Sequence, residues 1–135
     1  MSVNGAPVDD SAFTLKGGDE AGGAARRAIV AGDGALPEPV RDDVLLLATE
    51  LVSNAVRHAG VGPDKSLQVE VRRWPRQVRV AVVDPGAGFE PPGQHPPRDG
   101  PGGLGLLLLD RIADRWGVSR EPAGTRVWFE IDFKG

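Results

Sequence analysis

Two polar side chains stand one helical turn apart in the mostly apolar segment 47–58. Glu50 and Asn54 are four positions apart, so they share one face of a helix. Polar groups beside the buried side of a helix need partners, and either a hydrated metal ion or a neighbouring loop can supply them. The apolar residues that recur around them at helical spacing are Val44, Leu47, Ala48, Leu51, Val52, Ala55 and Val56.

A second group of residues combines an acid with two glycines. Asp84 follows an alternating apolar segment, and Gly86 and Gly88 come directly after it. A carboxylate fixed at a strand end can accept a hydrogen bond from an exocyclic amine such as that of adenine, and the glycines let the backbone approach a flat ring. Asp-Pro-Gly taken alone is also an ordinary turn sequence.

A third group is the glycine-rich segment 100–106, which leads into a predicted helix. Backbone amides at a helix start lack partners within the helix, and the helix dipole is positive there, so such a segment favours phosphate. The pattern is not specific by itself, because many helices begin after glycine.

The elements that must position these groups follow from periodicity and from turn residues. We predict three helices. The first begins after Asp19 and ends at Gly32 to Gly34, and the second runs from about Val40 to Gly60. The third spans 104–116 and stops at Gly117. Alternation predicts strands at 13–15, 67–72, 78–82, 118–121 and 125–133. The intervening residues 84–103 are predicted to form a long functional loop.

This order of elements predicts an α+β fold, a two-layer sandwich in which three helices cover one face of a mostly antiparallel sheet. We expect one domain over 13–135, preceded by a flexible tail over 1–12. In the last strand Trp128 and Arg126 point away from the apolar side chains, so the uncovered face is a candidate contact surface for a second chain.

Composition excludes several classes of function. The 135 residues carry a formal net charge of −3 and no cysteine, which argues against non-specific nucleic-acid binding, disulfides and thiolate metal sites. No apolar run reaches membrane-spanning length and the first residues do not read as a secretory signal, so we expect a soluble, cytoplasmic protein that binds neither membrane nor nucleic acid directly.

Taken in order, the three groups resemble the sequence boxes of the GHKL superfamily of ATPases and kinases, which share the Bergerat ATP-binding fold. Within it the chain is most similar to the anti-sigma serine kinases of the RsbW and SpoIIAB kind. Residues 50–58 look like the asparagine box, residues 84–88 like the Asp-x-Gly-x-Gly box, and residues 103–106 like the second glycine box. The resemblance extends from about Phe13 to Phe133.

The resemblance implies a role for each of these residues. Asn54 would ligate the Mg²⁺ of Mg-ATP, Asp84 would bind the adenine amino group, and Glu50 would act as a general base. Residues 89–101 would close over the nucleotide as a lid. The backbone positions that would border the base or wrap the phosphates are Gly86, Gly88, Gly102, Gly103, Leu104, Gly105 and Leu106.

Two basic residues at the end of the asparagine box are further candidates for nucleotide binding. Arg57 lies on the same side as Asn54, where it can contact phosphate or form an ion pair with an acid such as Asp43. His58 lies near the end of the helix, where the dipole favours an imidazole as a cap. Arg98 in the lid is a candidate phosphate ligand. We interpret the charged run at 110–115 as a solvated helix face.

The resemblance implies an ATP-dependent serine/threonine-protein kinase that phosphorylates a STAS-domain anti-anti-sigma protein, sequesters a sigma factor and forms a homodimer. One alternative is a non-catalytic module whose nucleotide state controls partner binding. Another is the catalytic fragment of a histidine kinase, which needs a phosphoacceptor histidine on a helical hairpin. His58 and His95 lie in the asparagine box and the lid, so neither is expected to serve as that acceptor.

Overall fold

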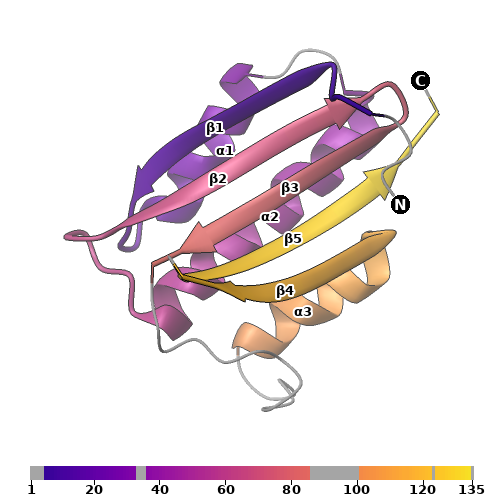
Figure 1. Cartoon of the computed structure of the whole chain (residues 1–135). Helices are drawn as coiled ribbons and strands as arrows, with labels where there is room; N and C mark the ends of the chain where they lie inside the picture. Colours follow the sequence, from indigo (N-terminus) through magenta and orange to yellow (C-terminus); the bar gives the residue numbers. More distant parts are fainter. Residues whose placement is uncertain (1–4, 33–35, 86–100, 123, 135) are drawn as a thin grey trace.

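The computed structural model describes residues 5–32, 36–85, 101–122 and 124–134. Five strands form one antiparallel sheet in the order β1-β2-β3-β5-β4, and three helices accompany it (Figure 1). In chain order the elements are β1 Asp9–Lys16, α1 Ala21–Gly32, α2 Glu38–Ala59, β2 Ser66–Trp74, β3 Gln77–Asp84, α3 Pro101–Ile112, β4 Arg115–Glu121 and β5 Gly124–Asp132.

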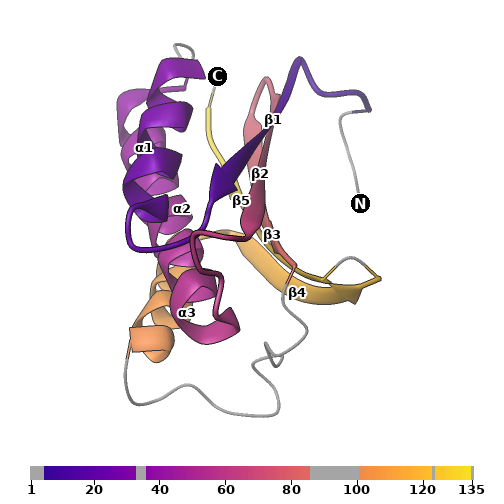
Figure 2. The same cartoon turned by 90° about the vertical axis from the view of Figure 1, so that its left-hand side faces the viewer.

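All three helices lie on one face of the sheet, and the other face is open (Figure 2). The core fills the space between the two layers, with Leu47 and Val52 of α2 packed against core-facing strand residues such as Val80 and Phe129. This arrangement confirms the predicted two-layer α+β fold. Within the described ranges, no helix is both long enough and apolar enough to span a membrane.

Helix α2 is the central helix of the covering layer and contacts α1, α3 and β3. Pro39 stands in its first turn, where a missing amide hydrogen costs no helical hydrogen bond, and Gly60 ends it with a φ of 68° in the left-handed region. Helices α1 and α2 lie close together at Gly22, where a β-carbon would be only 2.8 Å from Ser53 Oγ. Glycine at this position therefore permits the close approach. The predicted bounds of α2 are therefore confirmed to within two residues.

The first strand begins earlier than predicted. Residues 9–12 belong to β1 and pair with residues 70–73 of β2. The prediction that these four residues belong to a flexible tail is therefore wrong. Asp9, Asp10 and Ser11 are polar and the segment is mostly exposed, so no hydrophobic pattern marks it as a strand. Ion pairs of Asp9 with Arg73 at 3.0 Å and of Asp10 with Arg72 at 3.3 Å join the two strands instead.

The third helix and the strand after it also differ from the prediction. Helix α3 runs from Pro101 to Ile112 rather than over 104–116, and residues 115–117 belong to β4. Trp116 continues the helical apolar spacing but packs against the core from the strand. Gly117 is not a helix stop. A β-carbon there would lie 2.9 Å from the Trp128 ring, so glycine makes room for that ring across β4.

The charged run at 110–115 is consequently not one helix face. Asp110 accepts a hydrogen bond from the Trp116 indole at 3.3 Å, and Asp114 accepts one from the backbone amide of Asp132 at 2.7 Å. Arg115 pairs with Glu130 at 2.6 Å on the open face of the sheet. These charges connect the end of α3 and β4 to β5.

Candidate functional site

Three of the predicted elements meet at one end of the molecule. The C-terminal half of α2, the end of β3 and the start of α3 lie together at the lower end of both views (Figures 1 and 2). Helix α2 contacts both β3 and α3. The structure therefore brings the asparagine box, Asp84 and the beginning of α3 to the same end of the fold.

Asn54 is 7% exposed and lies on α2 among core residues. Its amide oxygen accepts a hydrogen bond of 2.7 Å from the Arg57 guanidinium, one turn further along the helix. Arg57 is exposed and contacts Asn54 rather than Asp43, the acid considered as its partner. The oxygen of Asn54, the predicted metal ligand, thus faces the Arg57 guanidinium.

Glu50 stands one turn before Asn54 and is half-buried. Within the described part of the chain its carboxylate makes no hydrogen bond and no ion pair, so both oxygens remain available to a hydroxyl or a water. His58 is exposed in the last turn of α2, where a positive charge interacts favourably with the helix dipole.

Asp84 is the last residue of β3 and is only 3% exposed. A carboxylate so deeply placed needs polar partners, because its charged form loses most of its hydration. The β3–β5 ladder fixes its position by pairing it with Thr125, which is 1% exposed. The prediction that Asp84 ends a strand is therefore confirmed, and the structure adds that the residue is buried.

Two residues near Asp84 were missed by the sequence analysis. Thr125 is a buried polar residue opposite Asp84. Gly124 has a φ of 146°, and a β-carbon on it would lie 1.8 Å from the Asp84 carbonyl oxygen. A glycine followed by a threonine at the start of an apolar strand was the available signal, but it was read only as a hairpin turn.

The glycine-rich segment lies inside α3 rather than before it. Pro101 is the first helical residue and has no amide hydrogen, so the backbone amides of residues 102 and 103 are the ones without intrahelical partners, whereas residues 104–106 belong to the hydrogen-bonded part of the helix. Such amides at the positive end of a helix dipole suit a phosphate. Gly86, Gly88, His95, Arg98 and most of the lid segment lie outside the described residues.

The donor set suits a metal that arrives with its own ligands. Among the described residues, no three His, Cys, Asp or Glu side chains gather as a complete metal site. Asn54 supplies an amide oxygen next to the Glu50 carboxylate. The Asn54 amide oxygen is a suitable ligand for a hard cation such as Mg²⁺, which commonly keeps several waters and takes the remaining oxygens from phosphates. The residues present therefore fit Mg²⁺ bound to a nucleotide.

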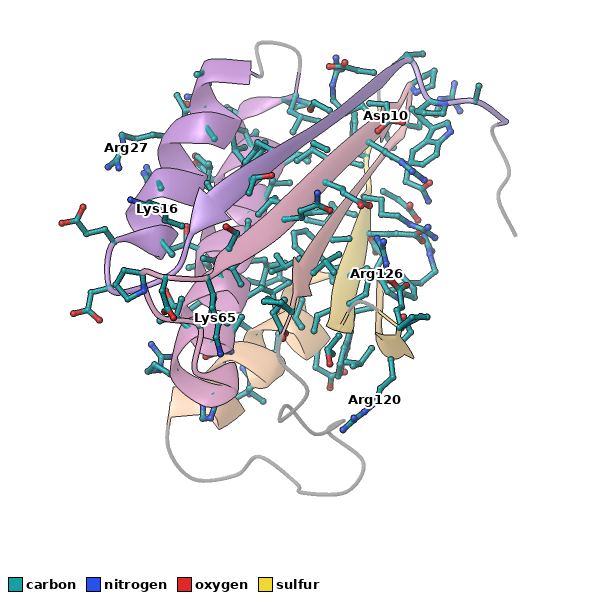
Figure 3. All side chains as sticks on the ribbon, turned by 60° about the vertical axis from the view of Figure 1, so that its left-hand side comes forward. Asp10, Lys16, Arg27, Lys65, Arg120 and Arg126 are labelled. Atoms are coloured by element: carbon teal, nitrogen blue, oxygen red, sulfur yellow. The ribbon has the colours of Figure 1, made fainter. Side chains whose placement is uncertain are left out.

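A second feature lies on the open face of the sheet, away from the helices. Figure 3 shows Arg126 on this side and Arg27 on the opposite, helical side. A hollow of about 220 Å³ is lined by Glu70, Arg72, Arg79, Ala81, Ser119, Arg126 and Trp128. The Arg79 guanidinium lies 5.0 Å from the centre of the Trp128 ring, within cation–π distance.

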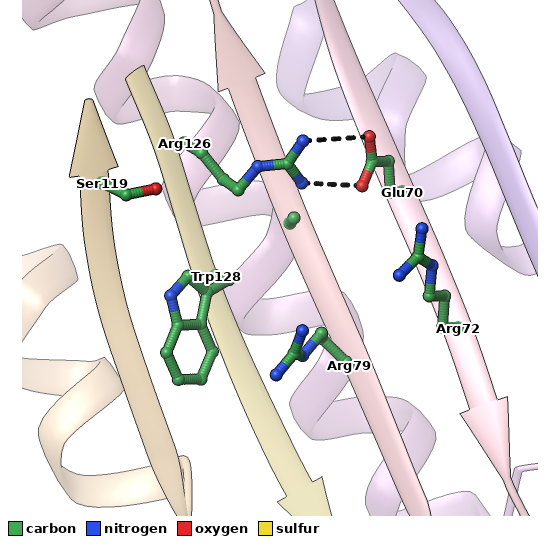
Figure 4. A pocket seen from close by; sticks show the side chains of 7 residues that line it. Glu70, Arg72, Arg79, Ser119, Arg126 and Trp128 are labelled. Carbon is green, nitrogen blue, oxygen red and sulfur yellow. Dashed lines mark hydrogen bonds and ion pairs between the residues drawn. The ribbon is translucent and has the colours of Figure 1, made fainter. Parts of the chain in front are cut away.

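The charges around this hollow are paired. Arg126 holds Glu70 with two hydrogen bonds of 2.7 and 3.4 Å (Figure 4). Hydrogen bonds that the Arg126 guanidinium donates to Glu70 and, with a smaller effect, to Glu121 raise the pKa of Arg126. Burial alone would raise the pKa of Glu130, but hydrogen bonds from Arg115 and Arg79 outweigh burial and hold that pKa below its ordinary value. The open face thus carries a network of ion pairs beside Trp128.

Comparison with known proteins identifies the family. The sequence matches the histidine kinase-like ATPase domain over residues 20–131, so the chain belongs to this family. It is a GHKL-type ATP-binding, kinase-like domain. A search of curated protein sequences found no match.

Among solved structures, the chain is similar to the histidine kinase domain of the blue-light activated histidine kinase from Erythrobacter litoralis EL346. The two are 25% identical with a TM-score of 0.54, and the match covers 88% of this chain and 65% of that chain. The similarity supports the assignment of the fold.

The contact between Gly124 and Asp84 generates a testable prediction. Gly124→Ala should lower the free energy of unfolding by about 1–3 kcal/mol, because a β-carbon collides with the Asp84 carbonyl and the backbone conformation disfavours alanine. Gly32→Ala is the matched control, since nothing lies within 4 Å of a β-carbon there. Urea unfolding measures both variants. Equal stability of the two would show that this contact does not constrain Asp84.

Proposed function

We propose that the protein is a Mg-ATP-dependent serine/threonine-protein kinase and anti-sigma factor that acts in the cytoplasm. The observation that supports this most strongly is the pair of buried oxygen acceptors, Asn54 and Asp84, at the end of the fold where α3 begins. Its substrate would be a STAS-domain anti-anti-sigma protein, and its alternative partner a sigma factor. Those two partners rest on the resemblance of the asparagine and glycine boxes.

Each residue has one task in this proposal. Asp84 accepts a hydrogen bond from the adenine amino group, with Gly86 and Gly88 beside the base. Asn54 holds the metal, which neutralises charge on the phosphates. The free backbone amides at the start of α3, those of residues 102 and 103, bind the phosphates, with Leu104, Gly105 and Leu106 in the helical turn behind them and with Arg57 and His58 at the edge of the site. Glu50 takes the proton of the attacking hydroxyl.

Nucleotide recognition by Asp84 is the first property to test. Asp84→Asn should weaken ATP binding roughly tenfold to a hundredfold, because a buried hydrogen bond to a charged acceptor contributes about 1.5–3 kcal/mol. Calorimetric titration with ATP measures the effect, and Asp110→Asn, an exposed acid on α3, is the control. Parental affinity in Asp84→Asn would show that the adenine does not contact Asp84.

The roles of Asn54 and Glu50 can be separated because one residue holds the metal and the other moves a proton. Asn54→Ala should lose Mg-ATP affinity and phosphotransfer together. Glu50→Gln keeps the size and hydrogen bonding of the side chain but cannot take a proton near neutral pH, so nucleotide binding should persist while transfer slows on the order of 10²–10⁴-fold.

Initial rates of STAS-protein phosphorylation at saturating Mg-ATP measure this difference. Positioning and electrostatics dominate phosphoryl transfer, so the decrease in rate on loss of the base is expected toward the lower end of this range, about 10²-fold. Near-parental turnover by Glu50→Gln would refute the general-base role. If the parent binds ATP yet transfers no phosphate, the protein is the non-catalytic module whose nucleotide state controls partner binding.

The similarity to a histidine kinase domain supports a second candidate function, the ATP-binding part of a histidine kinase. The same nucleotide site serves both chemistries, so the acceptor decides between them. Phosphate on serine or threonine survives acid, whereas phosphate on histidine is lost. Acid treatment of a radiolabelled product therefore distinguishes the two candidates.

We further propose that the open face of the sheet binds a second copy of the chain. Trp128 lies beside the paired Arg79 and Arg126, and an aromatic residue among arginines is typical of an interface. Trp128→Ala should shift the protein toward the monomer in sedimentation velocity. Trp116→Ala, on the core face of β4, is the control and should leave the oligomeric state of the folded protein unchanged. An unchanged oligomeric state in Trp128→Ala would exclude this surface.

A further inference from the structure

The hydrogen bond between Arg57 and Asn54 places a cation on the amide oxygen that is the proposed metal ligand. The distance from Arg57 Nη2 to Asn54 Oδ1 is 2.7 Å. Asn54 is 7% exposed, whereas Arg57 is exposed, so the guanidinium approaches the oxygen from the solvent side of the site.

A guanidinium has hydrogen-bond donors and no acceptor. Its bond to Asn54 therefore selects the amide orientation in which the oxygen, and not the NH₂ group, is turned toward it. That is also the orientation in which the amide can ligate a hard cation. Without Arg57, a largely buried acceptor would lose the partner that it has in the described structure, which is unfavourable.

We propose that Arg57 is a stand-in for the metal: in the metal-free protein it holds the Asn54 oxygen in the ligating orientation, and it is displaced from that oxygen when the metal binds. Two cations on one amide oxygen repel each other, so occupation by one disfavours the other. Arg57 is then a positioning residue that stabilises the empty site and releases its ligand on loading. This inference rests on the proposed binding of Mg-nucleotide at Asn54.

The first test measures the coupling in the protein without nucleotide or metal. Arg57→Met keeps the aliphatic part of the side chain but removes the donors. It should increase the unfolding equilibrium constant about threefold to tenfold, as expected for one hydrogen bond. In an Asn54→Ala background, where the acceptor is absent, the same change should alter it less than about twofold. Arg26→Met, an exposed arginine on α1, is the control in both backgrounds, and equal effects of Arg57→Met in the two backgrounds would overturn the proposal.

The second test follows displacement directly. In protein with ¹⁵N-labelled arginine, the Arg57 guanidinium signal is identified by its loss in Arg57→Met. It should keep its position when a non-hydrolysable ATP analogue is added with EDTA, and it should move when Mg²⁺ replaces EDTA. Arg57→Lys, which retains a cationic donor, should keep most of the stability of the parent.

The outcomes separate this inference from the proposed function. A signal that ignores Mg²⁺, although Mg²⁺ strengthens binding of the analogue, would overturn the stand-in role alone. A signal that already moves in EDTA would assign the displacement to phosphate and would also overturn it. If Mg²⁺ has no effect on analogue binding in the parent, the proposed metal site itself fails.

Discussion

The candidate site depends on keeping two oxygen acceptors almost fully buried beside an apolar core. Asn54 and Asp84 are 7% and 3% exposed. Each is held there by packing that also stabilises the fold: Asn54 by the apolar face of α2, and Asp84 by the β3–β5 ladder. Buried polar groups are costly without partners, so both residues require polar contacts at this end of the fold.

The sheet separates two kinds of interaction by the alternation of its side chains. Core-facing residues such as Val80 and Phe129 pack under the helices, whereas Arg79 and Glu130 form ion pairs on the open face. Strand β5 contributes to both regions, since Thr125 lies opposite Asp84 and Trp128 lies on the open face. The candidate functional site and the proposed dimer surface thus share strand β5.

Sequence patterns predicted the parts of the fold that have strong periodicity. Helix α2, the β2–β3 hairpin, the position of Asn54 beside the buried side of its helix and the position of Asp84 at a strand end followed from spacing and turn residues. Residues 9–12 were misassigned because the backbone ladder and cross-strand charges hold this part of β1 to β2, without an apolar alternation that the sequence could show. The end of α3 was misassigned because Trp116 happens to match a helical period while it belongs to a strand.

Within the site, the sequence did not predict contacts that depend on tertiary packing. Gly124 is distant from Asp84 in sequence, and only the strand pairing brings its backbone against the Asp84 carbonyl. The bond from Arg57 to Asn54 spans three residues, but its competition with an ion pair to Asp43 could not be decided from spacing. The roles of Gly86, Gly88 and the lid remain predictions from the sequence boxes.

The central claim is that a buried acid reads adenine while an amide oxygen holds the metal of the same nucleotide. Calorimetric titration with ATP and with GTP, each in the presence of Mg²⁺ and of EDTA, tests both halves at once. The account predicts that ATP binds more tightly than GTP under both conditions, because Asp84 needs an amino group at that edge of the base, and that Mg²⁺ strengthens the binding of ATP. Equal binding of ATP and GTP, or binding of ATP that is indifferent to Mg²⁺, would contradict it.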